Sequence, residues 1–182
     1  NGPQVFRSGR GVEVKDIDGN SYIEGMSGLW CASLGFNEIE LVEAAITQMK
    51  KLPFYHSFTG KTCESTINLS EKLIEVAPNN LKKIFFCNSG SEANDTAIKI
   101  VWYYHASLGN PQKRKIISRK GSYHGVTLAA ASLTALDYAQ KGFGLPLDFA
   151  IHTTWPHYFQ NSNENESEKE FCNRLVSDLE KL

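Results

Sequence analysis

Short apolar runs alternate with helical patterns through the second half of the chain. The runs lie at residues 83–87, 115–119 and 149–155, and two segments with helical periodicity, residues 91–108 and 125–136, separate them. A strand, a helix and a second strand in succession favour a parallel sheet, because parallel neighbours are joined by long crossovers that are usually helical. Open sheets of this kind bind ligands beyond the carboxyl ends of their strands. The alternation therefore predicts an α/β fold with candidate site residues directly after each strand.

The N-terminal part of the chain is predicted to be antiparallel. Its stretch EVKDIDGNSYIE predicts a β-hairpin with Asp18-Gly19 at the turn, because Asp-Gly is a preferred pair for tight hairpins. We expect residues 1–35 to form an N-terminal small-domain segment. Residues 36–182 are then expected to form the first part of a larger α/β domain.

Two helices are predicted between the hairpin and the first apolar run. Residues 37–52 carry apolar side chains at helical spacing and begin with Asn37-x-x-Glu40, a pattern typical of a capped helix start. Residues 62–77 have the same periodicity. A proline follows each segment and marks its end.

The chain ends inside a further helical pattern. Residues 161–170, NSNENESEKE, are polar and acidic and predict a surface loop or a helix start. An apolar stripe follows them at helical spacing: Phe171, Leu175, Leu179 and Leu182. No helix terminus is recognisable near the last residue, and three parallel strands would leave an unpaired sheet edge. We therefore expect an incomplete chain, a fragment of a longer protein.

The segment after the first apolar run has the pattern of an anion site. Ser89-x-x-Glu92 matches a capping box, in which the serine hydroxyl accepts from the Glu92 N–H and the carboxylate accepts from the Ser89 N–H. Unpaired N–H groups and the positive end of the helix dipole favour an anion such as phosphate at such a start. Gly90 allows close approach, and the hydroxyls of Ser89 and Ser91 are spare donors. A capping box alone indicates only a stable helix start; its position after a buried strand favours the phosphate site.

A second cluster, GSYHG, follows the next strand. Gly121 and Gly125 flank Tyr123 and His124, which would place an aromatic ring and a titratable imidazole at the same edge of the sheet. Taken alone, the cluster is more typical of a turn with a packed tyrosine and a hydrogen-bonded histidine; its position after a second strand favours a site. Other aromatic and apolar residues in loops are candidates for a ligand pocket, for core packing or for an interface: Leu29, Trp30, Tyr55 and Phe58.

Three motifs together resemble a known family. GVEVKDIDGNSYIEGMSGLW, NSGSEANDTAIKI and GSYHGVTLAAASLTAL are similar, in this order, to the class III pyridoxal phosphate aminotransferases, especially their ω-amino acid:pyruvate and amine:pyruvate branch. The resemblance implies a fold type I transferase, here the small-domain segment and the first half of the large mixed-sheet domain. It also implies pyridoxal 5'-phosphate as cofactor, amino transfer from an amine or ω-amino acid to a keto acid such as pyruvate, and a homodimer for the full-length protein.

The resemblance also implies roles for individual residues. The family's cofactor-binding positions correspond to Ser89, Gly90 and Ser91 at the phosphate, Tyr123 stacked on the pyridine ring, and His124 beside it. Its substrate pocket corresponds to Leu29, Trp30, Tyr55 and Phe58. The lysine that forms a Schiff base with the cofactor belongs to motifs that are not found in these residues, so no catalytic residue is assigned. Lys120 is predicted to be a solvated lysine before a turn, and this chain alone is not expected to catalyse the reaction.

Composition argues against several other classes of protein. Nineteen basic and twenty acidic side chains leave a net charge of -1, so no field of one sign indicates a nucleic acid or membrane partner. The four cysteines are scattered, with no C-x-x-C pair typical of a metal site, and we expect reduced thiols and no metal. No apolar run reaches the length of a bilayer span, and we expect a cytoplasmic protein.

Two other functions remain open from the sequence. The chain could be a non-catalytic module that keeps half of the fold and binds a partner through its free sheet edge. It could also be another phosphate-binding α/β enzyme, such as a nucleotide-binding one. That function predicts a P-loop lysine or an acidic ribose contact, and neither is found at the expected place.

Overall fold

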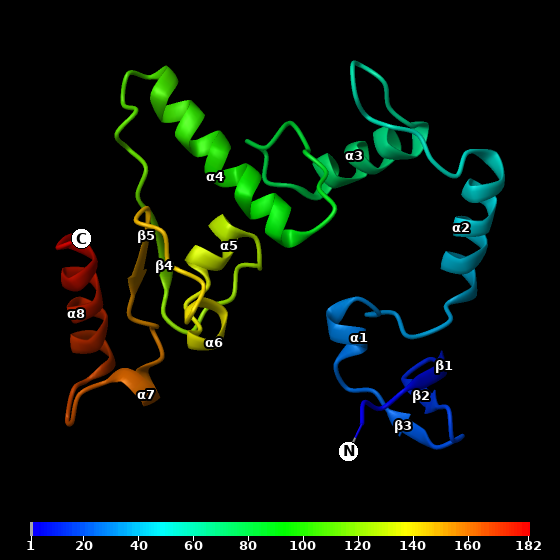
Figure 1. Ribbon diagram of the computed structural model, residues 1–182, viewed down its shortest axis with the longest axis horizontal. Helices are drawn as coiled ribbons and strands as arrows, with labels where there is room; N and C mark the ends of the chain where they lie inside the picture. The colour runs from blue at the N-terminus through cyan, green and yellow to red at the C-terminus, as the bar shows by residue number, and fades with distance from the viewer. Residues whose placement is uncertain (1) are drawn as a thin grey trace. The chain divides into compact units, whose positions relative to one another are not determined.

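The computed structural model describes residues 2–182, which divide into two compact units (Figure 1). Unit 1 is Asn1–Lys83 and unit 2 is Ile84–Leu182. The domain boundary expected between residues 35 and 36 concerns the complete protein and stays a prediction.

Unit 1 begins with a three-stranded antiparallel sheet in the order β1-β2-β3. The strands are β1 (Phe6–Arg10), β2 (Glu13–Asp16) and β3 (Ser21–Ile23). Asp16 holds the turn between β2 and β3, because its carboxylate accepts hydrogen bonds from the N–H groups of Asp18 and Asn20 at 3.0 and 2.9 Å. Gly19 occupies the left-handed region there, with φ of 90°. The predicted hairpin and its turn are confirmed.

Three helices follow the sheet in unit 1. They are α1 (Ser27–Trp30), α2 (Ile39–Lys51) and α3 (Glu64–Val76). The two longer helices confirm the predictions for residues 37–52 and 62–77. The predicted cap at Asn37 is wrong: α2 starts after Glu38 without a side-chain cap. Asn37 has φ of 60°, and a capping side chain needs the extended backbone conformation instead.

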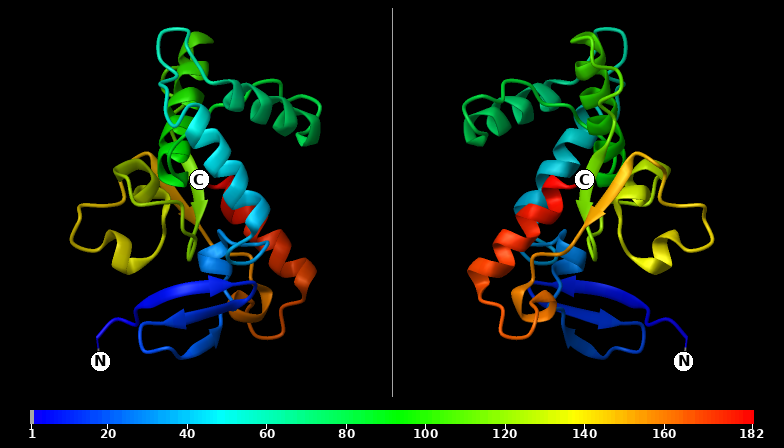
Figure 2. Two further views of the ribbon diagram at one scale, coloured as in Figure 1. Left: turned by 90° about the vertical axis from the view of Figure 1, so that its right-hand side faces the viewer. Right: turned by 90° about the vertical axis from the view of Figure 1, so that its left-hand side faces the viewer.

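Unit 2 contains a parallel pair of strands joined by a helical crossover, with the strands side by side (Figure 2). The strands are β4 (Ile116–Arg119) and β5 (Ala150–Thr153). The helices are α4 (Gly90–Ser107), α5 (Leu128–Leu133), α6 (Asp137–Gln140), α7 (Tyr158–Asn161) and α8 (Glu168–Glu180). The β4-α5-α6-β5 order confirms the predicted parallel α/β arrangement.

Two predictions for residues 83–136 are wrong in detail. Residues 83–87 do not form a strand, because among the described residues no strand lies beside them to accept and donate the ladder hydrogen bonds. The sheet therefore has two parallel strands where three were expected. The helix predicted over residues 125–136 is shorter, since Thr134 has an extended ψ of 116° that ends α5. The polar stretch before α8 ends in a capping box at Ser167, as expected for a helix start.

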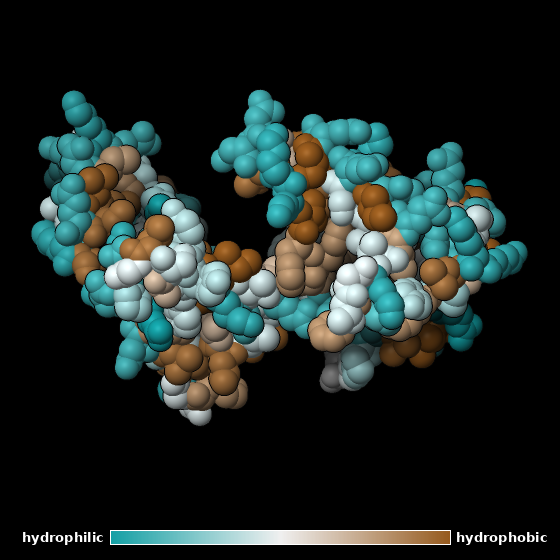
Figure 3. All heavy atoms as spheres, turned by 90° about the horizontal axis from the view of Figure 1, so that it is seen from above, coloured by the Kyte–Doolittle hydropathy of each residue, from teal (hydrophilic) through white to brown (hydrophobic). Residues whose placement is uncertain are grey.

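The core of unit 2 lies around α5. Its residues Ala130, Ala131 and Leu133 are buried, as are Ile98 of α4 and Phe171 of α8. Small side chains allow α5 to approach its neighbours closely, and buried hydroxyls are paired: Ser118 Oγ donates to the Leu133 carbonyl at 2.7 Å. Large apolar side chains also remain at the surface of the molecule, where brown areas are visible in Figure 3.

Candidate functional site

The first turn of α4 presents unpaired backbone donors. The Ser89 hydroxyl accepts from the Glu92 N–H at 3.2 Å, which confirms half of the predicted capping box. The other half is wrong: the Glu92 carboxylate accepts from the N–H of Asn88 at 2.8 Å and not from that of Ser89. Among residues 2–182, the N–H groups of Gly90 and Ser91 donate no hydrogen bond. An 18-residue helix thus directs its positive end and two free amides outward.

Gly90 leaves open space in front of those amides. A Cβ built on this residue meets no atom within 4 Å. The backbone conformation is ordinary, so the glycine is not needed there for a turn. The open space is therefore available to a ligand, and a phosphate group matches both the free donors and the helix dipole.

The loop after β4 is hydrogen-bonded to this helix start. Asn94 Nδ2 of α4 donates to the His124 carbonyl at 2.6 Å, and the Val126 N–H donates to Ser91 Oγ at 3.0 Å. These contacts join segments about 30 residues apart in the sequence. The structure therefore brings together the two clusters that the sequence singled out, with Tyr123 exposed and His124 half-buried next to the first turn of α4.

Gly125 makes this approach possible. It is buried, its φ is 131°, and an added Cβ would lie 2.5 Å from Ser91 Oγ and 2.9 Å from the Cβ of Ala130. Contacts that short do not occur between real side chains, so any other residue would move the loop away from α4. The sequence identified this glycine as part of a turn, but the reason for it is the close approach to Ser91.

Three residues of this region were missed by sequence analysis: Asn94, Asp95 and Thr134. One oxygen of the Asp95 carboxylate accepts from the Thr127 hydroxyl at 2.8 Å and from the Ala130 N–H at 2.9 Å. It thereby caps α5 from a neighbouring helix, since Thr127 makes no cap of its own. Asn-Asp inside a helix was an available signal, because both residues are poor helix formers unless their side chains bond elsewhere.

The candidate substrate residues lie on two segments of unit 1. Leu29 and Trp30 have positive φ values of 60° and 67°, a conformation that costs about 1 kcal/mol or more per residue and is frequent at functional sites. Tyr55 stacks on His56 with ring centroids 4.7 Å apart. Trp30 and Phe58 are highly exposed, at 77% and 76% of their surface. Their predicted role in a substrate pocket stays a prediction.

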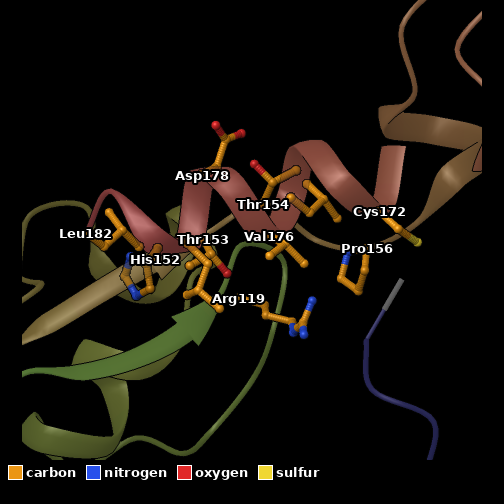
Figure 4. A pocket seen from close by; sticks show the side chains of 11 residues that line it. Arg119, His152, Thr153, Thr154, Pro156, Cys172, Val176, Asp178 and Leu182 are labelled. Carbon is orange, nitrogen blue, oxygen red and sulfur yellow. The ribbon is translucent and has the colours of Figure 1, made fainter. Parts of the chain in front are cut away.

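A separate cavity lies between α8 and the ends of the two parallel strands (Figure 4). Its volume is about 320 Å³, and Val176 and Leu179 of α8, with Leu182 just after the helix, line one side of it. Arg119 and His152 line the strand side, while Asp178 points away from the strands in Figure 4. The cavity contains none of the predicted site residues.

An ion pair holds the segment before α8. Arg174 donates from Nε to Glu166 Oε1 at 2.7 Å and from Nη2 to the Asn161 carbonyl at 2.9 Å. The Arg174 guanidinium, together with the N–H of Asn163, lowers the pKa of Glu166 from 4.5 to about 2. The pair connects α8 to the loop before it in unit 2 and includes none of the candidate site residues.

Within residues 2–182, no cluster of His, Cys, Asp and Glu has the geometry to hold a metal ion. All four cysteines are free thiols. Lys120 is exposed at a turn, in agreement with its predicted role as a solvated lysine. None of the helices in the described part of the chain is both long enough and apolar enough to span a membrane.

A sequence model of the family described as aminotransferase class-III matches residues 2–182. The chain belongs to the class III aminotransferases. This confirms the family that the three motifs indicated. Because the family model covers all of residues 2–182, it does not support the alternative of a nucleotide-binding enzyme.

Relatives of this class III aminotransferase carry several transaminase names. The chain is 47% identical over 181 residues to vanillin aminotransferase of Capsicum frutescens, covering 99% of this chain and 39% of that protein. It is 46% identical to gamma-aminobutyrate transaminase 1, mitochondrial, of Oryza sativa subsp. japonica, of which it covers 35%. The chain thus spans well under half of the length of these relatives.

Solved structures confirm the expected fold. The omega transaminase from Pseudomonas jessenii in complex with PMP matches with a TM-score of 0.96 and 49% identity, over 99% of this chain and 40% of that one. An omega-aminotransferase from Paracoccus denitrificans matches with a TM-score of 0.95 and 45% identity, over 100% and 40%. The chain therefore has the fold type I architecture, of which these residues form a part.

The residues of unit 2 fit the phosphate group of pyridoxal 5'-phosphate. Two free amides, the hydroxyls of Ser89 and Ser91, and the open space at Gly90 provide the donor set that a phosphate needs. The exposed ring of Tyr123 follows on the adjoining loop. These are the two groups by which a protein can orient such a cofactor, one for its anionic end and one for its ring.

Proposed function

We propose that the complete protein transfers an amino group from an amine or ω-amino acid to a keto acid such as pyruvate, with pyridoxal 5'-phosphate as cofactor. Membership of the class III aminotransferases supports this function, as do the omega transaminase names of the similar solved structures. One observation on this chain carries the proposal. Free amides at the start of α4 are held next to the Tyr123–His124 loop by direct hydrogen bonds.

The phosphate is bound by Gly90, Ser91 and Ser89 in this proposal. The two free N–H groups donate to phosphate oxygens, and the dipole of α4 stabilises the negative charge. Ser91 Oγ accepts from the Val126 N–H, so its own proton is free to be donated to the phosphate. Hydrogen bonds to a charged acceptor of this kind contribute about 1.5–3 kcal/mol each.

The loop after β4 orients the ring. Tyr123 stacks on the pyridine ring, and His124 lies beside it with its backbone held by Asn94 and Thr134. When bound, pyridoxal phosphate supplies an electron sink for bond changes at the carbon that carries the amine. In this proposal, residues 1–182 bind and orient the cofactor. The proton-transferring lysine that the family resemblance implies is not among them.

The substrate is proposed to meet the exposed residues Leu29, Trp30, Tyr55 and Phe58. Their apolar surface suits an aliphatic or aromatic amine. We also propose a homodimer for the complete protein, because large exposed aromatic side chains are typical of interfaces. The cytoplasmic location stays a prediction, and names of relatives include mitochondrial and chloroplastic forms.

A substitution at Gly90 tests the phosphate site in the complete protein. Gly90→Leu puts a side chain into space that is open here, so the fold should tolerate it while a phosphate is excluded. Affinity for pyridoxamine 5'-phosphate, which cannot form a Schiff base with a lysine, should fall about thirtyfold or more, equivalent to one or two charged hydrogen bonds. The dissociation constant is measured by titration of cofactor absorbance.

Ala97→Leu is the matched control, because Ala97 is exposed on the same helix two turns from its start. It should leave the dissociation constant unchanged. Equal affinity of the Gly90→Leu variant and the unsubstituted protein would refute the phosphate site. Absence of any cofactor binding or amino transfer by the complete protein would favour the non-catalytic module instead.

A further inference from the structure

The backbone of His124 is held from two different elements. Its N–H donates to Thr134 Oγ1 at 2.8 Å, and its carbonyl accepts from Asn94 Nδ2 at 2.6 Å. Thr134 follows α5, whereas Asn94 lies on α4. The peptide groups on both sides of this residue are therefore fixed by side chains, although the loop itself has no regular secondary structure.

Thr134 is fully buried, and its hydroxyl both accepts and donates a hydrogen bond. Its exposed surface is 0%, and Oγ1 lies 3.1 Å from the Gly125 carbonyl and 3.2 Å from the Ala130 carbonyl. A hydroxyl has one proton, so it donates to one of these carbonyls while it accepts from the His124 N–H. A side chain of the same shape without the oxygen would leave that part-buried N–H without its acceptor.

We infer that Thr134 and Asn94 are positioning residues, which set the Tyr123–His124 segment at a fixed separation from the free amides of Gly90 and Ser91. The inference rests on the proposed function. The phosphate and the ring of the cofactor are separated by a short, fixed set of bonds, so their two binding groups must be held at a matching separation. Loop backbone cannot hold this separation by itself, and the two side chains supply the constraint.

A merely structural role makes a different prediction. Loss of a buried hydroxyl anywhere in unit 2 would then weaken folding and binding together. Ser118→Ala is the matched control, because Ser118 is buried and its hydroxyl donates to the Leu133 carbonyl at 2.7 Å and not to His124. Thr134→Ser is the conservative variant, since it keeps the hydroxyl and removes only the methyl group.

The experiment uses the complete protein freed of cofactor. For each variant, the dissociation constants of pyridoxamine 5'-phosphate and of inorganic phosphate are measured, together with the circular dichroism of the bound cofactor. Thr134→Val and Asn94→Leu should each weaken the binding of pyridoxamine 5'-phosphate by about tenfold, which corresponds to the loss of one buried hydrogen bond. The dichroism of the cofactor band should fall as well, because the ring loses its fixed orientation.

The affinity for inorganic phosphate distinguishes a positioning role from a merely structural role, since phosphate is proposed to contact only the first turn of α4. Its affinity should stay within about twofold in both variants, because one lost hydrogen bond on the loop does not alter the α4 amides. Thr134→Ser should restore cofactor affinity and dichroism, and Ser118→Ala should leave both unchanged.

Several results would overturn the inference. An equal loss of phosphate and cofactor affinity, the same loss in Ser118→Ala, or an unchanged dichroism in both variants would each do so. If Thr134→Val does not fold, Asn94→Leu at a half-buried position decides the question. Failure of the proposed function gives a different result, in which Gly90→Leu also binds pyridoxamine 5'-phosphate normally.

Discussion

Unit 2 and unit 1 differ in how their distant segments are held. In unit 2, hydrogen bonds donated by Asn94 and accepted by Asp95 and Ser91 connect α4 to residues about 30 positions later. In unit 1, Val14 and Asp16 of the hairpin are buried, whereas α2 and α3 contain no buried residue. One unit has a tertiary core, and the other has a sheet followed by helices whose apolar side chains are exposed.

The difference bears directly on the two parts of the proposed active site. The proposed cofactor residues lie in unit 2, where hydrogen bonds within the unit connect their two segments. The proposed substrate residues lie on exposed segments of unit 1, at positions such as Trp30 and Phe58. We infer that the phosphate and ring positions form with the core of unit 2, while the substrate pocket requires additional protein surface to cover these side chains.

Hydrogen exchange on residues 1–182 expressed alone tests this contrast most strongly. Amides of α2 and α3 should exchange about a thousandfold faster than those of α4 and α5, because exchange protection follows buried packing. The β2 strand, with its buried Val14, serves as an internal reference for protected amides in unit 1. Mass spectrometry of peptides reports each segment separately. Similar protection of α2 and α4 would show that the contrast is wrong.

Substitution of Gly125 should have the next largest effect. Gly125→Ala places a Cβ 2.5 Å from Ser91 Oγ at a φ of 131°, so the free energy of unfolding should fall by about 3 kcal/mol. Gly142→Ala is the control, because Gly142 also has a positive φ of 87° but no atom within 4 Å of its Cβ. It should cost about 1 kcal/mol. Denaturant unfolding measures both, and equal losses would contradict the close approach of the loop to α4.

The Glu166–Arg174 pair predicts a pH dependence confined to unit 2. Arg174 lowers the pKa of Glu166 from 4.5 to about 2, so the folded form binds this proton less readily than the unfolded form. The resulting stabilisation is complete above pH 4.5 and is lost as the pH falls through about 2. The difference in unfolding midpoint between the unsubstituted chain and Glu166→Gln should therefore shrink over that range.

Glu164→Gln provides the matched control, since Glu164 is exposed in the same loop. Its difference from the unsubstituted chain should be small at every pH. A difference for Glu166→Gln that stays constant from neutral to acid pH would contradict the ion-pair explanation.

The smallest effect is expected at Asn37 in unit 1. Its φ of 60° favours glycine or asparagine, so Asn37→Gly should change the free energy of unfolding by less than about 0.5 kcal/mol. Asn37→Ser should cost about 1 kcal/mol, since serine enters the left-handed region less readily. At a true helix cap serine would replace asparagine without loss. A neutral Asn37→Ser variant in thermal unfolding would therefore restore the capping role that the sequence predicted.

Much of the fold could be predicted because its signals are local. The hairpin turn at Asp18-Gly19, the helices α2, α3 and α4, and the parallel strands all follow from turn chemistry and periodicity. The failures are of another kind. Residues 83–87 have the composition of a strand, but no strand pairs with them among residues 2–182, and Glu92 bonds one residue further upstream than the capping pattern predicts. In each case the outcome depended on which strand or backbone N–H group lies nearby in the folded structure.

The sequence by itself determined the family, the order of helices and strands, and the Ser-Gly-Ser turn at the start of α4. Spacing and residue type carry that information, because they act within a few positions along the chain. Only the tertiary structure showed that Thr134 and Asn94 hold His124 and that Gly125 lies against Ser91. A hydrogen bond between residues 30 positions apart depends on how the elements pack, and no local pattern encodes that distance.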